Sequence, residues 1–155
     1  MSAQTKASFA GNQIPQSSVV IYWIIAVVAL VGLADATFLT VAHLTGDDAV
    51  CGSLAGCSKV LGSAYASTLG IPTAAFGAAA YFCVFSLAVL AAFRYPVVHV
   101  LLSLLVSLML LGSLYFLYLQ AFVLHAFCPF CLGSAAVSFL LAGLTLFAPR
   151  PERAA

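Results

Sequence analysis

The sequence predicts an all-α integral membrane protein built as a four-transmembrane-helix bundle. Hydrophobic residues make up 65% of the 155-residue chain and charged residues only 6%, with a formal net charge of +1. Soluble domains carry about 25% charged residues, so this chain has too few charges to cover a water-facing surface. Five Lys and Arg residues also cannot build a basic patch, which excludes a nucleic-acid-binding protein.

Four apolar segments are long enough to cross a bilayer, which needs about 20 apolar residues. We expect transmembrane spans at residues 19–44, 72–93, 97–127 and 130–148. The third segment is longer than a bilayer requires, so we expect it to tilt or protrude. Ala34-Asp35-Ala36 resembles a signal-peptide cleavage site, but the apolar run continues past it, which favours a retained span. One membrane domain, residues 19–148, would lie between polar tails at 1–18 and 149–155.

The positive charges predict how the bundle is oriented. Four of the five cations fall on one side of a four-span chain: Lys6, Arg94, Arg150 and Arg153. The positive-inside rule makes that side cytoplasmic. Both tails are therefore expected in the cytoplasm, and the loop at 45–71 and the short connection before Cys128 are expected outside.

The outer loop contains a pattern typical of a short amphipathic helix. Within residues 58–67, apolar side chains recur at helical spacing with polar residues between them: Val60, Leu61, Ala64 and Tyr65. We expect this helix to lie on the membrane surface and to roof the bundle. Gly70-Ile71-Pro72 would end it and begin the second span.

Four of the five cysteines are predicted to lie at the outer face, on the oxidising side of the membrane. Cys51 and Cys57 form a C-x5-C motif in the loop, and Cys128 and Cys131 form a C-x2-C motif at the start of the last span. Pro129 suits the first position of a helix, which puts Cys128 near its N-cap and Cys131 in its first turn. Free N–H groups there stabilise a thiolate, the form that attacks disulfides. The motifs indicate two dithiol/disulfide pairs close together, although four cysteines allow three connectivities.

Other interpretations of the cysteines belong to other classes of protein. Four cysteines can hold zinc in a membrane metal-binding or metal-transport protein, but an oxidising compartment disfavours free thiolate ligands. Both pairs could be static disulfides, yet four long apolar spans need no such staple. A redox-sensing or scaffold subunit without turnover is a further alternative. Cys83, alone inside the second span, is expected to be a small buried apolar side chain.

Asp35 is an acid inside the first span, about 14 Å from its outer end at roughly 1.5 Å per residue. An ionisable group at that depth is expensive and suggests a function, so Asp35 is a candidate proton relay. A protonated, hydrogen-bonded structural Asp is the alternative. His43 and His125 lie near the outer face and could assist protonation, whereas His99 lies near the cytoplasmic side.

The order of these features resembles the vitamin K epoxide reductase family, in its bacterial type. An outer-loop cysteine motif is followed by a Ser six residues later, by Gly-Ile-Pro opening the next span, and by C-x2-C at the mouth of the last span. The resemblance covers about residues 32–134. It rests on Cys51, Cys57, Ser63, Gly70-Ile71-Pro72, Gly77, Tyr81, Cys128 and Cys131.

This resemblance implies a four-helix bundle surrounding a quinone near the outer face of a bacterial inner membrane. It implies an enzyme that oxidises a thioredoxin-like partner and passes the electrons to a ubiquinone or menaquinone (vitamin K type), supporting disulfide bond formation. By motif, Cys51 and Cys57 would be the shuttle pair, and Cys128 and Cys131 the pair beside the quinone. Cys131 would lie closest to the quinone ring, and Ser63 would line its pocket.

Aromatic side chains of the spans are further candidates for contact with the quinone, although helical aromatics in a bundle more often serve packing. They are Phe38, Phe76, Tyr81, Tyr115, Phe116 and Tyr118. We expect Phe76, Tyr81 and Tyr115 to contribute to the quinone site.

Several positions depart from the family's patterns. The animal enzymes have a Tyr four residues past the second C-x2-C cysteine, where this chain has Ala135, and an Asn in the second span, where residues 73–77 offer none. Plain quinone reduction is therefore favoured over vitamin K epoxide reduction. Many bacterial members carry a fused thioredoxin-like domain, whereas only residues 149–155 follow this bundle, so we expect a separate extracytoplasmic partner. The alternative enzyme is a disulfide bond formation protein B-like oxidase, whose C-x2-C comes in the first outer loop rather than the second.

Overall fold

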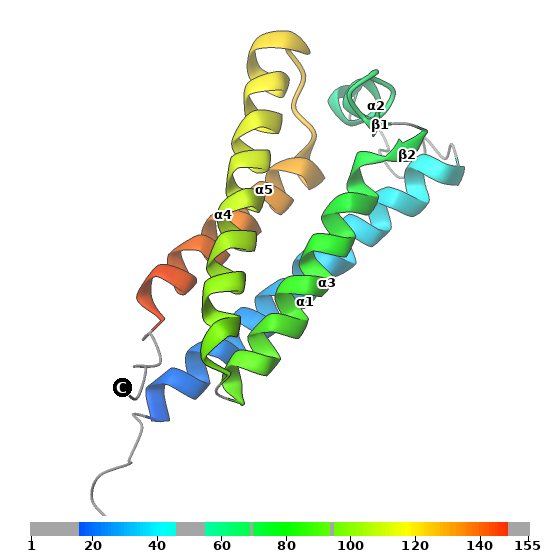
Figure 1. The fold of residues 1–155 in the computed structure, drawn as a ribbon. Helices are drawn as coiled ribbons and strands as arrows, with labels where there is room; N and C mark the ends of the chain where they lie inside the picture. Colours follow the sequence, from blue (N-terminus) through cyan, green and yellow to red (C-terminus); the bar gives the residue numbers. More distant parts are fainter. Residues whose placement is uncertain (1–15, 46–54, 69, 94, 149–155) are drawn as a thin grey trace, which may run out of the picture.

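The computed structural model describes residues 16–45, 55–68, 70–93 and 95–148. Its four long helices are α1 (Gln16–Thr45), α3 (Thr73–Ala92), α4 (Pro96–Tyr118) and α5 (Pro129–Phe147). Each of these segments is long and apolar enough to cross a membrane. The predicted all-α bundle of four transmembrane helices is confirmed (Figure 1).

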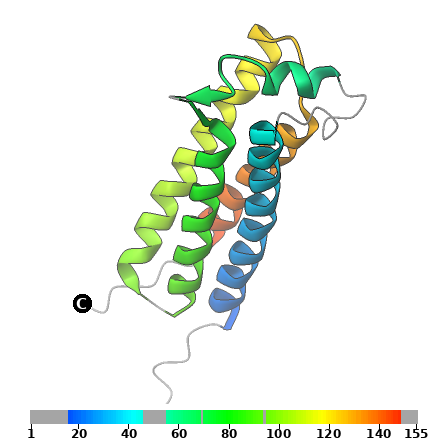
Figure 2. The same ribbon diagram turned by 90° about the vertical axis from the view of Figure 1, so that its right-hand side faces the viewer.

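The four helices pack as a ring. Helix α1 packs mainly against α3 and α5, and α4 packs mainly against the same two helices. Helix α1 begins and α5 ends at one end of the bundle, while the short helix α2 and the two short strands lie at the opposite end (Figures 1 and 2). The ring order follows the chain, because short connections make consecutive long helices antiparallel neighbours.

The third span ends earlier than its apolar run predicts. Helix α4 continues into a π-helical turn, η2 (Leu119–Val123), and regular structure stops there rather than at residue 127. The chain leaves the helix at His125, which has a positive φ of 46°, and then runs extended to Cys128. Hydropathy could not reveal where the helix ends, because residues 124–127 are mostly apolar like the span before them. In the structure they form the turn that leads the chain back toward the bundle.

The short helix of the outer loop also differs from its prediction. Helix α2 spans Ala55–Leu61, so it begins before residue 58 and ends well before residue 67. Turns follow it, and then strands β1 (Ser67–Thr68) and β2 (Ile71–Pro72) pair antiparallel around Gly70. Gly70 has a φ of 79°, a conformation that glycine adopts without steric cost.

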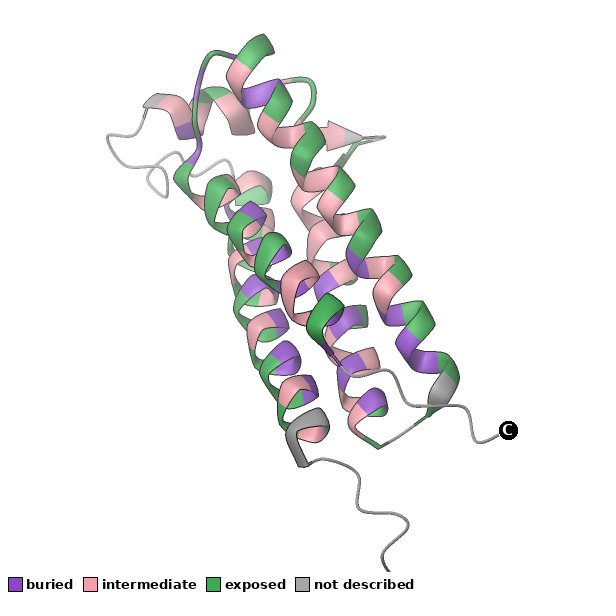
Figure 3. Cartoon of the chain, turned by 90° about the vertical axis from the view of Figure 1, so that its left-hand side faces the viewer, coloured by how far each residue is buried: buried purple, intermediate pink, exposed green. Residues whose placement is uncertain are grey.

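The core of the bundle is made of small and branched apolar side chains on the inner helix faces, which Figure 3 colours purple. Its most deeply buried members are Ile25, Ala29, Tyr81, Val84, Ala88, Leu102 and Leu141. Gly32 of α1 faces Tyr81 of α3, and a Cβ at residue 32 would overlap the Tyr81 ring. Small residues at such contacts let membrane helices approach closely.

The outer helix faces carry large exposed apolar side chains, as a lipid-facing surface should. Cys83 lies on this face of α3 together with its exposed neighbour Phe82. The prediction of a buried Cys83 was therefore wrong. Its helical phase, rather than its apolar surroundings in the sequence, decides which way it points.

The residues on which the predicted orientation depends lie outside the described part of the chain. These are Lys6, Arg94, Arg150 and Arg153. Lys59, the remaining cation, is exposed on α2, at the end of the bundle away from the start of α1 (Figure 1). The orientation stays a prediction.

Candidate active site

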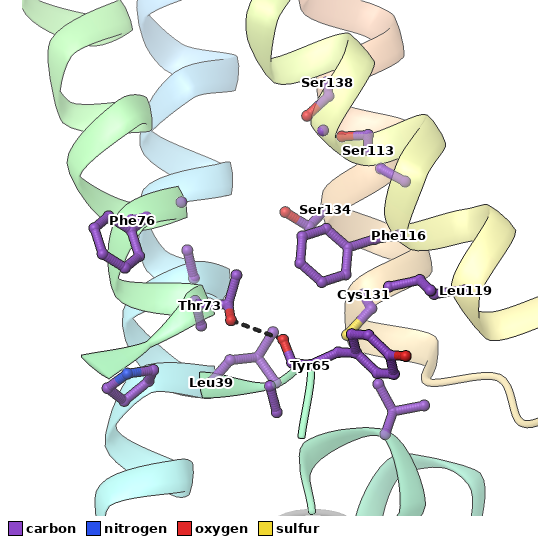
Figure 4. A pocket seen from close by; sticks show the side chains of 18 of the residues that line it. Leu39, Tyr65, Thr73, Phe76, Ser113, Phe116, Leu119, Cys131, Ser134 and Ser138 are labelled. Atoms are coloured by element: carbon purple, nitrogen blue, oxygen red, sulfur yellow. Dashed lines mark hydrogen bonds between the residues drawn. The ribbon is translucent and has the colours of Figure 1, made fainter. Parts of the chain in front are cut away.

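A cavity of about 400 Å³ lies at the α2 end of the bundle. Figure 4 shows α1 and α3 on one side of it, α4 and α5 on the other, and α2 across its end. Its lining is mostly apolar and includes Leu39, Val60, Phe76, Leu105, Phe116 and Leu119. The volume and the sparse polar groups are typical of a site for a small, largely apolar molecule.

Cys131 lines this cavity, and Figure 4 draws its side chain on the side formed by α4 and α5. The local structure is the one that the C-x2-C motif predicts. Cys128 is the N-cap of α5, and Pro129 occupies the first turn. Because helix α5 starts here, the free N–H groups of its first turn converge on the two cysteines.

Cys57 and Cys128 pack in one buried cluster, and both are 0% exposed. Cys57 is disulfide-bonded, while Cys128 and Cys131 carry free thiols. Gly56 permits this packing, because a Cβ at residue 56 would lie only 2.5 Å from the Phe127 carbonyl oxygen. The loop motif and the C-x2-C motif therefore meet in space. Cys51, the other cysteine of the loop motif, lies outside the described residues.

The thiol of Cys128 is unusually acidic. The pKa of Cys128 is lowered from 9.0 to about 7, chiefly by hydrogen bonding to the Cys131 side chain and also by the backbone N–H groups of Cys131 and Phe130. Burial opposes this effect, and the charge of Asp35 also raises the pKa of Cys128. A pKa lowered in this direction favours the thiolate of Cys128, as expected for a cysteine at a helix N-terminus.

Gln120 was missed by the sequence analysis. It lies in η2, is 2% exposed and lines the cavity. Its Oε1 accepts a hydrogen bond of 2.8 Å from the Cys128 backbone N–H, and its carbonyl oxygen accepts one of 3.1 Å from Ala126 N–H. The available signal was an amide inside an otherwise apolar span, because polar side chains at such depth usually have a specific partner.

Tyr81 forms part of the cavity wall and is 1% exposed. Its hydroxyl donates to the Ser134 carbonyl oxygen at 2.8 Å, and lies 3.0 Å from the Ser134 hydroxyl and 3.1 Å from the Ser138 hydroxyl. These bonds connect α3 to α5 one to two turns beyond Cys131. Tyr81 thus borders the cavity while its hydroxyl group is bonded to α5.

The structure brings together most of the other predicted site residues. Ser63 and Phe76 line the cavity, and the Ser63 hydroxyl donates to the Val60 carbonyl oxygen at 2.7 Å. Tyr115 does not line it and is 54% exposed. Phe116 takes the inward position instead, because successive residues of a helix point about 100° apart.

The ionisable residues that the sequence offers as proton donors or acceptors lie at different distances from the cavity. His43 lines the cavity, and Asp35 precedes the lining residue Ala36. Asp35 Oδ2 is buried and has no hydrogen-bond partner among the residues that the structure describes. His125 is exposed beside the turn into α5. His99 packs edge-on against Tyr22 and does not line the cavity; that it lies on the cytoplasmic side stays a prediction.

Within the described ranges, no three or more His, Cys, Asp or Glu side chains gather closely enough to hold a metal ion. Comparison with known protein families gives a match to the vitamin K epoxide reductase family over residues 23–146. The matched range contains both cysteine motifs, the cavity and nearly the whole of the four long helices.

Proposed function

The chain belongs to the vitamin K epoxide reductase family, and we propose that it oxidises a thioredoxin-like partner through two cysteine pairs and passes the electrons to a membrane quinone. Family membership and the four apolar helices make it a multi-pass membrane oxidoreductase linked to a quinone. The cysteine relay, the partner and the disulfide-forming role are our proposal. The observation that carries it is the packing of Cys57 on Cys128 beside a cavity lined by Cys131.

The first exchange would take place at the loop pair. A thiolate of the reduced partner attacks the Cys51–Cys57 disulfide at Cys51, forming a mixed disulfide and releasing Cys57 as a thiolate. The second thiol of the partner then attacks the mixed disulfide, so the partner leaves oxidised and Cys51 is reduced. Two electrons and two protons have moved from the partner to the loop pair.

The second exchange would pass these electrons inward. The Cys57 thiolate attacks Cys128 of a Cys128–Cys131 disulfide, which forms a Cys57–Cys128 bond and frees Cys131. Cys51 then attacks Cys57, re-forming the loop disulfide and releasing Cys128. The acidity of Cys128 supports this release, because a thiol with a pKa of about 7 is a good leaving group. The packing of Cys57 and Cys128 in one buried cluster supports a direct exchange between them.

The cavity suits a quinone headgroup by its volume, its apolar lining and the thiol on its wall. A quinone bound there would supply the electron-accepting chemistry, taking up two electrons and two protons. Cys131 would be the thiol nearest to it, and closure of the Cys128–Cys131 bond would release the electron pair. Phe76 and the Tyr81 ring would hold the headgroup, and Ser63 would border it.

We propose Asp35 as the proton relay of this step. Its buried Oδ2 has no hydrogen-bond partner among the described side chains and backbone groups, and its charge acts on Cys128. This charge effect puts the Asp35 carboxyl within electrostatic range of the C-x2-C motif. An ionisable side chain at this depth is costly, which favours a function over a passive role.

The proposal includes a bacterial inner membrane, with both tails in the cytoplasm and the cysteine pairs on the extracytoplasmic face. Four of the five cations support it by the positive-inside rule. The oxidising compartment on that side suits a disulfide relay. The thiol partner would then be a separate thioredoxin-like protein of the periplasm or its equivalent.

A trapping experiment tests the relay. With a partner whose second cysteine is replaced by Ser, attack on the Cys51–Cys57 disulfide cannot be resolved, so a mixed disulfide with Cys51 should accumulate on non-reducing gels. In a Cys57→Ser variant the loop holds no disulfide to attack, so the mixed disulfide should not form and oxidation of the native partner should stop. Cys83→Ser is the matched control, because Cys83 lies on the lipid-facing side of α3, and it should behave as the wild type. Oxidation of the partner at the native rate by Cys57→Ser would refute the relay.

A further inference from the structure

The orientation of the Gln120 amide is fixed by its neighbour. A backbone N–H can only donate a hydrogen bond, so the atom that faces Cys128 N–H at 2.8 Å must be the amide oxygen. The NH₂ group is the other arm of the same planar amide and points away from Cys128. Gln120 lines the cavity and is almost wholly buried, so this arm cannot turn to bulk water.

The NH₂ group of Gln120 donates no hydrogen bond to any residue within 16–45, 55–68, 70–93 or 95–148. The amide nitrogen is not among the fully buried polar atoms that lack a partner, so it keeps some accessible surface on a residue that lines the cavity. An acceptor from outside the chain can reach it there and satisfy the donor. Most hydroxyl groups of the residues that line the cavity already form hydrogen bonds within the protein. Thr73 donates to the Tyr65 carbonyl oxygen, and the Tyr81 hydroxyl is bonded to α5.

We propose that Gln120 is a quinone-binding residue whose NH₂ group donates a hydrogen bond to a quinone carbonyl oxygen while its Oε1 holds the Cys128 N–H. This inference rests on the proposed function and adds a specific recognition contact to it. A carbonyl oxygen is an acceptor, and it gains negative charge on reduction, so an N–H donor binds it more strongly as the reaction proceeds. The Gln120 side chain would thereby hold the quinone ring in a fixed position relative to the start of α5, where Cys131 lies.

The test uses infrared difference spectroscopy of the purified protein with bound menaquinone whose carbonyl groups carry ¹³C. It measures the carbonyl stretching bands of this quinone. With wild type, one carbonyl band should lie below its position in empty detergent micelles, and it should shift again when H₂O is replaced by D₂O. In Gln120→Met, which keeps the length of the side chain but has no donor, that band should return toward its micelle position. The quinone dissociation constant should rise about tenfold, as expected for one lost hydrogen bond.

Two other variants assign the contact. Ser107→Ala removes an exposed hydroxyl of α4 that bonds the Ser103 carbonyl oxygen, and it should leave the bands unchanged. Ser113 lines the cavity, and a band shift that is lost in Ser113→Ala but kept in Gln120→Met would overturn the proposal.

The outcomes separate this inference from the proposed function. A wild-type protein that binds and reduces menaquinone with no D₂O-sensitive carbonyl band overturns the role of Gln120 and leaves the proposed function standing. This measurement uses the wild-type protein alone. The role of Gln120 can therefore be refuted even if the Gln120→Met variant does not fold. A wild-type protein that binds no quinone overturns both.

Discussion

The packing of α2 onto the segment before α5 should control electron transfer between the two cysteine pairs. In a Gly56→Ala variant, the new Cβ would lie 2.5 Å from the Phe127 carbonyl oxygen, whereas ordinary contacts begin at 3.4 Å. The obstacle is backbone, which cannot rotate aside, so α2 must move by about 0.9 Å. Cys57 follows Gly56 directly and must move with it.

A displacement of this size has a large kinetic consequence. Thiol–disulfide exchange needs the reacting sulfurs aligned at close range, and a misplacement of about 1 Å can cost roughly a hundredfold in rate. We therefore expect Gly56→Ala to slow transfer from the loop pair to the C-x2-C pair by about a hundredfold. Reduction of quinone by an already reduced C-x2-C pair should slow much less, because Cys131 and the α5 wall of the cavity stay in place and only the α2 end of the cavity shifts.

Rapid mixing with reduced partner, acid quenching and mass spectrometry of the trapped thiols measure the first rate, and quinone absorbance measures the second. Gly143→Ala is the matched control, since a Cβ at residue 143 meets nothing within 4 Å. Native transfer between the pairs in Gly56→Ala would refute the reasoning. Equal slowing in both variants would show that loss of glycine, rather than the contact with Phe127, is responsible.

Three further predictions concern the bundle and the acidity of its thiols. Gly32→Ala should destabilise the bundle by about 1–3 kcal/mol, because its Cβ overlaps the Tyr81 ring; unfolding by sodium dodecyl sulfate measures this, and unchanged stability would contradict it. Ultraviolet absorbance of thiolate should titrate Cys128 with a midpoint of about 7, so thiolate is lost below that pH. In Cys131→Ala the midpoint should move up toward 9.0, because the main hydrogen bond that lowers the pKa is gone; a fixed midpoint would contradict that cause. Asp35→Asn should move the same midpoint down, since the charge that raises it is removed, and should slow quinone reduction; a native rate would argue against the proton relay.

The sequence was sufficient for features that depend on local chemistry. Length and hydropathy located four membrane helices, and most of their ends were predicted to within a few residues. Pro129 located the start of α5, and with it the N-cap position of Cys128. The motif order also predicted the family that the comparison with known proteins confirms.

The errors about which side chains face inward share one physical origin. Lipid is as apolar as the core of a membrane bundle, so hydropathy does not mark which face of a helix is buried. Tyr115 and Phe116 are equally plausible contacts by composition, and only the helix phase in the bundle turns Phe116 inward. The same ambiguity misplaced Cys83, which faces outward.

The amino-acid sequence by itself determined where the chain crosses the membrane, because burying apolar segments in lipid and starting a helix at a proline are properties of contiguous residues. Only the tertiary structure decided that Cys57 rests on Cys128 and that Gln120 holds the backbone of Cys128. Those contacts depend on how α2 closes over the end of the bundle and on how η2 turns the chain back. They are set by close packing between distant segments, which no local pattern of residues records.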